Sequence, residues 1–312
     1  MTTAIAHPNI ALIKYWGKAP GPLNIPASPS LSITLDQLTT TTSVTTQSHD
    51  RFVLNGMEAD DPKVAAWLTN LRTHLDIPGL SIETTNNFPT GAGLASSASG
   101  FAALITAINA HCKLGLDATA CSSLARQGSG SAARSLFGGF VELRAPEWCA
   151  TPLFDAAHWP LSVIIAVTDT GRKAISSSVG MERSRTTSPY YPAWITQTGV
   201  LFDEAREAIR LRNFSVLTRL SERSTLDMHA LMLSSQPPLL YWNGVSVALM
   251  HRITALRESG VPVFFTIDAG PQIKAVCLPE AMDVVESALR EVDGVRQLVR
   301  TKLGSGARVV ND

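Results

Sequence analysis

The chain has 312 residues, of which 45% are hydrophobic and 17% are charged. This length suits two domains that share a cleft, or one large α/β domain, and the composition argues against extensive disorder. The 26 basic and 26 acidic residues give a formal net charge of zero, so no long-range field attracts nucleic acid or an anionic membrane. Any anionic ligand must therefore be bound by locally placed groups.

Cysteine and histidine spacing argues against a metal centre. The four cysteines form no Cys-x2-Cys pair, and no His-x3-His pair occurs among His7, His49, His74, His111, His158, His229 and His251. These patterns favour neither a metal cluster, nor a disulfide framework, nor a zinc site. The N-terminus has no charged-then-apolar signal pattern, and no apolar run reaches the roughly 18 residues of a spanning helix. We therefore expect a soluble protein of the cytoplasm.

The sequence of the first 85 residues predicts mainly β-strands. Residues 9–13 form an apolar run that ends at Lys14, and Leu31, Ile33 and Leu35 alternate with polar residues. Both patterns predict strands. Further strands are expected at residues 39–47, 51–56 (closing in an Asn-Gly turn) and 80–85, with one helix over residues 61–75.

Residues 87–100 predict a phosphate-binding loop at the start of a helix. Pro89 ends the preceding extended run, and Gly91 and Gly93 allow backbone geometries that larger residues avoid. Ser96 and Ser97 then open an apolar helical pattern. Free backbone N–H groups at a helix start attract phosphate, although a plain glycine turn with a serine N-cap has the same composition. The stretch is neither a Walker loop nor a complete Gly-x-Gly-x2-Gly fingerprint.

The sequence of the remainder of the chain predicts helices and strands that are joined by two further polar loops. Asp117 predicts the N-cap of a short helix that ends near Gln127, and a second Gly/Ser loop over residues 128–140 carries Arg134. Residues 148–160 are typical of a crossing between domains, which we place at 1–155 and 156–312. The expected later elements are a strand at 161–167, a loop at 172–181, helices at 192–211, 215–233 and 245–258, a strand at 261–267, another strand, a helix at 281–292 and a final strand near Leu298.

Two charged residues have chemistry that their surroundings do not explain. Asp268 ends an otherwise apolar strand, where a carboxylate is costly to bury without a partner. A structural salt bridge is the ordinary reason, but beside Gly270 and Pro271 the side chain can instead project into a cleft and meet a substrate hydroxyl. A neighbouring lysine would keep its pKa low, and so keep it ionised at neutral pH. Arg134 has the planar fork that suits a carboxylate or a phosphate.

Five segments together match the motif order of one enzyme family. Residues 9–18, 87–98, 128–140, 176–181 and 268–271 resemble the mevalonate diphosphate decarboxylases, a branch of the GHMP kinase superfamily, and the resemblance covers nearly the full length. It implies an α+β, two-domain GHMP kinase fold. The N-terminal domain would be ribosomal protein S5 domain 2-like, the C-terminal domain ferredoxin-like α+β, and the active site would lie in the cleft between them. Relatives are often homodimers, so a homodimer is expected.

The resemblance also implies a reaction. Family members use ATP and Mg²⁺ to phosphorylate the tertiary 3-hydroxyl of mevalonate 5-diphosphate, and loss of phosphate and carbon dioxide then gives isopentenyl diphosphate. Asp268 would orient or deprotonate the hydroxyl, and Lys14 would lie near it and the transferring phosphoryl group. Arg134 with Asn9 would hold the substrate carboxylate, which makes Asp268, Lys14 and Arg134 the expected catalytic set.

The same resemblance assigns two binding sets. The expected substrate-binding residues are Asn9, Tyr15, Trp16, Gly17, Lys18, Lys63, Ser129, Gly130, Ser131, Arg134, Ser177 and Ser178. ATP would be bound by Pro89, Gly91, Ala92, Gly93, Leu94, Ala95, Ser96 and Ser97, with the Ser97 hydroxyl as a candidate Mg²⁺ contact.

Three departures from the family pattern concern the phosphate end of the substrate. The sequence has Ser-Pro-Ser at residues 28–30 where many relatives have Asn-Ser-Ser, Lys63 where an Arg is common, and Ser178 where relatives have Thr or Arg. Three other functions stay open: a decarboxylase of the 5-monophosphate, a kinase that stops at the phosphorylated product, and a non-enzymatic ligand sensor on the same fold. The presence of Lys14, Arg134 and Asp268 together favours decarboxylation.

Overall fold

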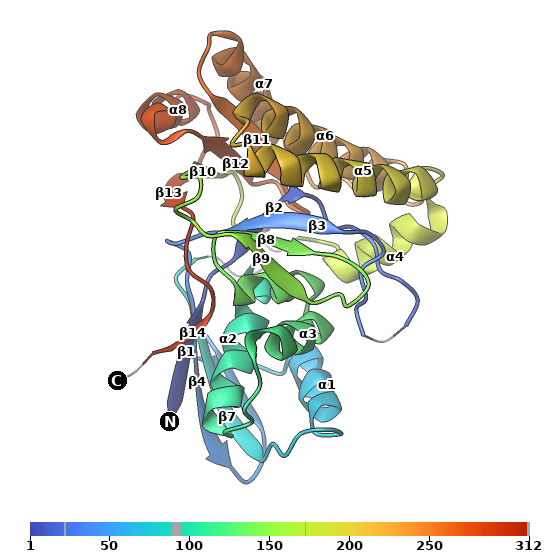
Figure 1. Cartoon of the computed structure of the whole chain (residues 1–312), viewed down its shortest axis with the longest axis vertical. Helices are drawn as coiled ribbons and strands as arrows, with labels where there is room; N and C mark the ends of the chain where they lie inside the picture. Colours follow the sequence, from blue (N-terminus) through green and yellow to red (C-terminus); the bar gives the residue numbers. More distant parts are fainter. Residues whose placement is uncertain (22, 89–94, 172, 311–312) are drawn as a thin grey trace.

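The computed structural model of the chain describes residues 1–21, 23–88, 95–171 and 173–310. Within that part, three β-sheets and their helices are stacked along the long axis of the molecule (Figure 1). Most of the predicted phosphate-binding loop, namely Pro89, Gly91, Ala92, Gly93 and Leu94, lies outside the described residues. No described helix is long and apolar enough to cross a bilayer.

A six-stranded sheet forms the base of the N-terminal half, and it is antiparallel except where β5 pairs with β7. Across the sheet the strands are β14 (Arg308–Val310), β1 (Thr2–Ala6), β4 (Thr40–Gln47), β7 (Gly79–Asn86), β5 (Arg51–Leu54) and β6 (Met57–Glu58). Its helices are α1 (Pro62–Leu71), α2 (Ser96–His111) and α3 (Ala118–Gly128). Helix α2 lies between the sheet and α3, and it buries Phe101, Leu104 and Ile105 there.

A second sheet lies in the middle of the molecule and forms the floor of the later site. In order, its strands are β2 (Asn9–Ile13), β3 (Ser30–Thr34), β8 (Phe140–Leu143) and β9 (Ala150–Phe154), all antiparallel. The 3₁₀ helix η1 (Gly130–Leu136) precedes β8. Strand β2 is buried along its whole length, because both halves of the chain pack against it.

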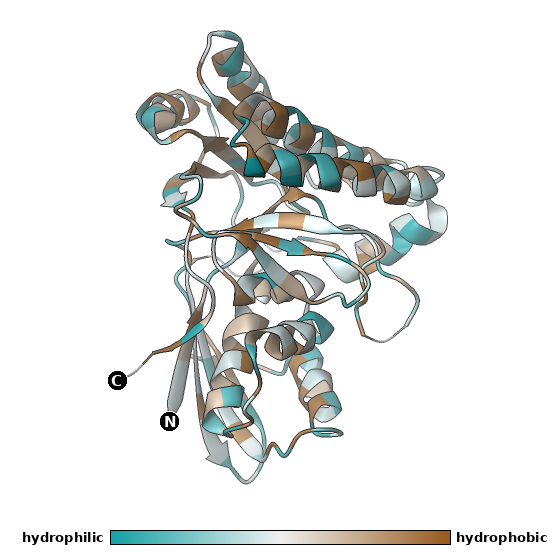
Figure 2. Cartoon of the chain, in the orientation of Figure 1, coloured by the Kyte–Doolittle hydropathy of each residue, from teal (hydrophilic) through white to brown (hydrophobic). Residues whose placement is uncertain are grey.

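The third sheet belongs to the C-terminal half and has helices on both faces. Its strands are β11 (Val263–Ile267), β12 (Ile273–Cys277), β10 (Ser162–Val167) and β13 (Gln297–Lys302). The helices are α4 (Ser177–Thr187), α5 (Tyr191–Arg210), α6 (Phe214–Leu233), α7 (Gly244–Glu258), the 3₁₀ helix η2 (Pro279–Ala281) and α8 (Met282–Arg290). Figure 2 shows hydrophobic residues concentrated on β11 and β12, which are buried along their whole length, as expected for strands that are covered on both faces.

Alternation along β11 explains how this sheet is covered. Val263, Phe265 and Ile267 pack in the cluster formed with α7 and α8, whereas Phe264 packs in the cluster formed with α5, α6 and the β2–β3 pair. Successive side chains of a strand point to opposite faces, so one strand contributes to both layers. Helices α5 and α6 thereby join the C-terminal sheet to the middle sheet.

Several predicted elements are confirmed. The side chain of Asp117 caps α3 by accepting a hydrogen bond from the Ala120 N–H (2.7 Å). Asn55 and Gly56 have φ values of 51° and 80°, and they form the turn between β5 and β6. The strands expected at residues 39–47 and 80–85, and the helix that begins at Ser96, are also present.

Other predicted elements are wrong. Within the Gly/Ser stretch 128–140, residues 130–136 form the 3₁₀ helix η1 rather than a loop. The loop expected at 172–181 gives way to α4 at Ser177, with Ser176 as its N-cap. The expected domain crossing contains β9, and the helix predicted to reach residue 75 ends at Leu71. Glycine and serine occur in loops and helix starts alike, so local composition does not separate the two.

The end of the chain returns to the N-terminal half. Strand β14 pairs with β1, which places the last strand in the first sheet (Figure 1). The sequence pattern did not predict either strand. The domain boundary between residues 155 and 156 stays a prediction, and β14 lies beyond it on the N-terminal side of the fold.

Gly304 makes this return possible. The Gly304 N–H donates to the carbonyl of Thr34 (2.8 Å), and its own carbonyl accepts from the Gly139 N–H (3.0 Å). A β-carbon on Gly304 would overlap the backbone carbonyl of Leu35 and lie 2.8 Å from the Cα of Asp36. The chain therefore passes against β3 too closely for any side chain.

We expect Gly304→Ala to lower the free energy of unfolding by about 1–3 kcal/mol, because backbone on both sides must shift. Gly199→Ala is the matched control, since Gly199 lies within α5 and has no atom within 4 Å of an added β-carbon. That control should gain about 0.5–1 kcal/mol from helix propensity. Urea unfolding monitored by circular dichroism gives both values, and a Gly304→Ala midpoint equal to that of the parent protein would contradict the packing argument.

Candidate active site

A cavity of about 300 Å³ lies between the two halves of the chain. It is lined by these predicted site residues: Asn9, Lys14, Tyr15, Trp16, Lys18, Lys63, Ala95, Ser96, Ser97, Ser129, Gly130, Ser131, Arg134, Ser177, Ser178 and Asp268. Gly17 lies beside this lining rather than in it. Its φ of +126° and the closeness of the Tyr191 side chain account for glycine there.

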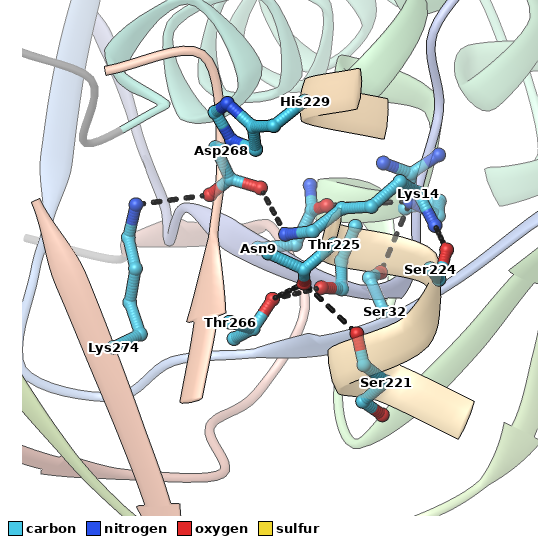
Figure 3. A network of polar contacts seen from close by, with 12 residues as sticks. Asn9, Lys14, Ser32, Ser221, Ser224, Thr225, His229, Thr266, Asp268 and Lys274 are labelled. Carbon is cyan, nitrogen blue, oxygen red and sulfur yellow. Dashed lines mark hydrogen bonds and ion pairs between the residues drawn. The ribbon is translucent and has the colours of Figure 1, made fainter. Parts of the chain in front are cut away.

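Asp268 lies between two lysines. It directly follows β11, and its Oδ1 accepts from the Lys14 Nζ at 2.7 Å while its Oδ2 is 3.0 Å from the Lys274 Nζ (Figure 3). Burial raises the pKa of this carboxyl, but the charges of both lysines outweigh burial and hold the pKa below its ordinary value. Asp268 is thus ionised at neutral pH, and its ion pair with Lys14 confirms that the two distant segments meet.

Lys14 is held by contacts from the C-terminal half. Its backbone N–H donates to the Ser224 Oγ of α6 (2.9 Å), and the Thr266 hydroxyl of β11 donates to the Ala11 carbonyl (2.9 Å). The side chain is 1% exposed. Burial lowers the pKa of Lys14 from 10.5 to about 8, although the negative charge of Asp268 acts to raise it.

Arg134 is buried in η1 and is held by the middle sheet. Its Nε donates to the Ser32 Oγ (3.0 Å) and the Asn9 Oδ1 (3.3 Å), and its Nη1 donates to the Ser30 Oγ (2.6 Å). Burial lowers the pKa of Arg134 to about 10, which still leaves it charged at neutral pH. Its Nη2 makes no hydrogen bond within the described part of the chain, so the guanidinium retains donors for a ligand.

The phosphate end of the predicted site joins both halves. Lys18 donates to the Asn24 Oδ1 (2.7 Å) and to the Ser178 Oγ (3.1 Å). Across the cavity, the Ser129 hydroxyl lies 3.1 Å from the Ser97 Oγ and 3.4 Å from the Ser131 Oγ. These hydroxyls and the Lys18 ammonium are the groups that phosphate oxygens prefer as donors.

Helix α2 presents its N-terminus to the same cavity. Ala95 is the N-cap residue, with φ of 56°, and no side chain caps the helix. The serine N-cap considered for this stretch is therefore absent, and the first N–H groups together with the positive end of the helix dipole favour an anion. Ser96 and Ser97 line the cavity at this point.

Two lysines of the site were not assigned from the sequence: Lys173, which lines the cavity, and Lys274, which lies behind Asp268. Lys274 in β12 is 1% exposed and contacts Asp268, and Lys173 donates to the Ser177 Oγ at 2.7 Å. Burial lowers the pKa of Lys173 from 10.5 to about 8. A lone charge in the apolar strand 273–277 was a signal for Lys274, by the same reasoning that singled out Asp268. Lys173 lies within the predicted loop at residues 172–181, but the sequence of that loop did not indicate that its ammonium group would contact Ser177 in the cavity.

The charges that line the cavity are strongly unbalanced. Among the residues that the structure describes, five cationic side chains line the cavity with one carboxylate: Lys14, Lys18, Lys63, Arg134 and Lys173 against Asp268. Such a surplus focuses a positive potential inside a chain whose net charge is zero. A cleft of this kind, with one ionised carboxylate at its base, defines an enzyme that acts on anionic, phosphorylated compounds.

The comparison with known proteins agrees with this class. Residues 6–150 match the family model of the diphosphomevalonate decarboxylase-like N-terminal domain, and residues 163–302 match that of the mevalonate 5-diphosphate decarboxylase C-terminal domain. The chain therefore belongs to the diphosphomevalonate decarboxylase family. The α+β, two-domain GHMP kinase-type fold predicted from the sequence is confirmed by the solved structures of this family.

Individual relatives resemble the chain over most of its length. It is 38% identical to the diphosphomevalonate decarboxylase of Ganoderma lucidum, covering 86% of this chain and 76% of the relative, and 33% identical to that of Candida albicans, covering 97% and 96%. The crystal structure of mevalonate diphosphate decarboxylase from Staphylococcus aureus superposes with a TM-score of 0.93 at 35% identity, covering 99% of this chain and 98% of the other. A solved structure of MDDEF in complex with MVAPP, AMPPCP and magnesium gives a TM-score of 0.92 at 36% identity, covering 100% and 99%.

We expect Asp268→Asn to lower kcat by at least ~10³-fold with little change in ATP affinity, because the lost group acts in the transition state rather than in uniform binding. Glu142→Gln is the control: Glu142 is also buried and bonded to Arg206 (2.7 Å), but it does not line the cavity. The control should lose stability and keep kcat. Steady-state kinetics with ATP titration measures both, and a near-normal kcat for Asp268→Asn would reduce Asp268 to an ion-pair partner.

The two lysines with lowered pKa predict the pH dependence. Because Lys14 and Lys173 lose their protons as the pH rises through about 8, the cavity loses positive charge and kcat/KM should fall on the alkaline side. In the double variant Lys14→Arg, Lys173→Arg the guanidinium groups stay charged, so the decline should move to higher pH whatever the absolute rate. A kcat/KM profile of the parent protein that stays flat well above these pKa values would contradict this assignment.

Proposed function

We propose that this chain catalyses the ATP-dependent decarboxylation of mevalonate 5-diphosphate to isopentenyl diphosphate, with release of ADP, phosphate and carbon dioxide. The observation that carries the proposal is the meeting of Asp268, Lys14 and Arg134 around one electropositive cavity. Family membership supports the same reaction. The roles below are inferred from the contacts of each residue.

Asp268 would orient the tertiary hydroxyl of the substrate and accept its proton. ATP supplies the phosphoryl group that turns this hydroxyl into a leaving group. A carboxylate with a lowered pKa is a weak base, so its main contribution is to hold the hydroxyl in line until phosphoryl transfer makes the proton acidic. Lys14, 2.7 Å from the carboxylate, would stabilise the negative charge that accumulates beside it.

Arg134 would bind the substrate carboxylate that is later lost as carbon dioxide. Its planar fork can form two parallel hydrogen bonds with a carboxylate. Asn9 would act through Arg134: its Nδ2 donates to the Ser131 carbonyl (3.0 Å) and the Ser135 Oγ (2.8 Å), while its Oδ1 accepts from Arg134. Because these bonds occupy the Asn9 amide, we place Asn9 behind the arginine rather than on the substrate.

The two phosphate-bearing ligands would take different sides of the cavity. The diphosphate of the substrate would be held by Tyr15, Lys18, Lys63, Ser129, Ser131, Ser177 and Ser178, which lie on both halves of the chain. ATP would place its phosphates at the start of α2, beside Ser96 and Ser97, with Lys173 near them. Trp16, Gly17 and Gly130 would support these groups through the backbone.

The residues present fit a magnesium ion that is carried mainly by the nucleotide. No group of three His, Cys, Asp or Glu side chains that could hold a metal occurs in the described ranges. Mg²⁺ in phosphate sites usually keeps several waters and takes only one or two protein ligands besides phosphate oxygens. The Ser97 hydroxyl, which lies at the N-terminus of α2, is the candidate for such a contact. A homodimeric state and a cytoplasmic location both stay predictions.

We expect the 5-diphosphate to be preferred over the 5-monophosphate. Each charged hydrogen bond contributes roughly 1.5–3 kcal/mol, so losing two of them should cost about several hundred-fold in kcat/KM. Release of carbon dioxide is measured with each ester under identical Mg-ATP. Equal or faster turnover of the monophosphate would contradict the diphosphate assignment, and ADP formation without carbon dioxide would identify a kinase that stops at the phosphorylated product.

A further inference from the structure

His229 is a buried histidine beside the catalytic carboxylate that has no role in the mechanism above. It lies on α6, is 2% exposed and neighbours Asp268 (Figure 3). It does not line the cavity, so it cannot contact a substrate there directly. Its function must therefore be exerted through the residues it touches.

The hydrogen bond from Trp242 determines which ring nitrogen of His229 carries the hydrogen. Trp242 donates from its Nε1 to the His229 Nε2 over 3.3 Å, and the two rings lie 4.5 Å apart. An indole N–H can only donate, so Nε2 is the unprotonated nitrogen and Nδ1 carries the hydrogen. The backbone of Ile267 lies near the ring and acts to raise its pKa, as a carbonyl that accepts from Nδ1–H does. The Nδ1–H group is therefore available to the carbonyl of Ile267, the residue directly before Asp268.

The position of Ile267 explains why such a partner is needed. Ile267 is the last residue of β11 that pairs with β12, opposite Ile273. Beyond it the chain turns tightly, with the Gly270 N–H donating to the Asp268 carbonyl at 2.8 Å. The sheet therefore stops supporting the backbone just where the orientation of Asp268 is decided. A hydrogen bond from His229 to the Ile267 carbonyl would supply support at that point.

The charge state of His229 suits this location. Burial, and next the charge of Lys14, lower the pKa of His229 to about 3. The ring stays neutral at physiological pH and adds no third cation to Lys14 and Lys274. A charged side chain in its place would further oppose the protonation of Asp268, whereas a neutral ring holds the backbone without changing the charge balance.

We propose that His229 is a positioning residue, whose neutral ring holds the Ile267–Asp268 peptide so that the Asp268 carboxylate keeps its orientation between Lys14 and Lys274. The inference rests on the proposed function, because it assigns His229 to the same reaction. It predicts that His229 affects the chemical step and leaves the binding of ATP almost unchanged, since no ligand contacts the ring.

Two substitutions separate the hydrogen bond from the bulk of the side chain. His229→Leu removes both hydrogen bonds, and His229→Asn retains a donor near the place of Nδ1. We expect His229→Leu to lower kcat by about 10- to 100-fold, as small displacements of catalytic groups do, with the KM for ATP within about twofold. His229→Asn should recover most of that loss. Trp242→Phe should give a smaller loss, because it removes only the outer bond of the chain.

His7→Leu is the matched control. His7 is also buried, at 7% exposed, and its Nδ1 bonds to the Leu38 carbonyl at 2.9 Å, but it does not line the cavity. This variant should lose stability as His229→Leu does and keep its kcat per folded molecule. A kcat for His229→Leu equal to that of the parent protein would overturn the proposal, and so would a loss in His229→Asn as large as in His229→Leu.

A measurement on the parent protein tests the tautomer without any activity. In protein labelled with ¹⁵N-histidine, long-range ¹H–¹⁵N spectra should show the His229 ring as the neutral Nδ1–H form, and it should stay so on acidification through 6.5, its ordinary pKa. The signal is assigned by its loss in His229→Asn. An Nε2–H tautomer, or titration near 6.5, would overturn the proposal even if His229→Leu failed to fold. Failure of the parent protein to release carbon dioxide would instead contradict the proposed function.

Discussion

Holding one partly buried carboxylate, 26% exposed, between two buried ammonium groups is the constraint on which this site depends. Asp268 follows β11, Lys14 follows β2 and Lys274 lies in β12, and both lysines are 1% exposed. Any one of these charges buried alone would cost several kcal/mol. Together they offset each other, and the remaining positive charge is available to an anionic ligand. The three segments must therefore be brought together before the site can exist.

Apolar packing and a few backbone contacts bring them together. Ile10 and Leu12 of β2 pack in the same cluster as Leu217 of α6 and Phe264 of β11, so the first strands of the chain form part of the C-terminal core. Two hydrogen bonds, from the Thr266 hydroxyl to the Ala11 carbonyl and from the Lys14 N–H to Ser224, then fix the position of β2 along β11 and α6. The catalytic charges are thus positioned by the joint between the halves rather than by either half.

The packing of the two halves against each other also explains how a chain with a net charge of zero can bind highly charged compounds. Acidic and basic residues are equal in number over the whole sequence, but the surface pairs them with one another, as in Arg72 with Asp50 and Arg185 with Glu182. Inside the cavity the cations have few such partners, so a strong local field survives. The contact between Lys18 and Ser178 shows that the phosphate end of the site also requires both halves.

Local chemistry determined much of this protein in advance. An apolar strand that ends in Asp268, an apolar helix that opens at Ser96, the Asp117 cap and the Asn-Gly turn can each be read from neighbouring residues, because hydrogen bonding and side-chain periodicity act over a few positions. The motifs around Lys14 and Arg134 likewise identified the family. Only the tertiary structure decided that Lys274 shares Asp268 with Lys14, that His229 lies beside Asp268, and that the last strand pairs with the first. These are contacts between residues far apart in the chain, and no local pattern specifies them, because burial and partner choice arise only when the layers pack.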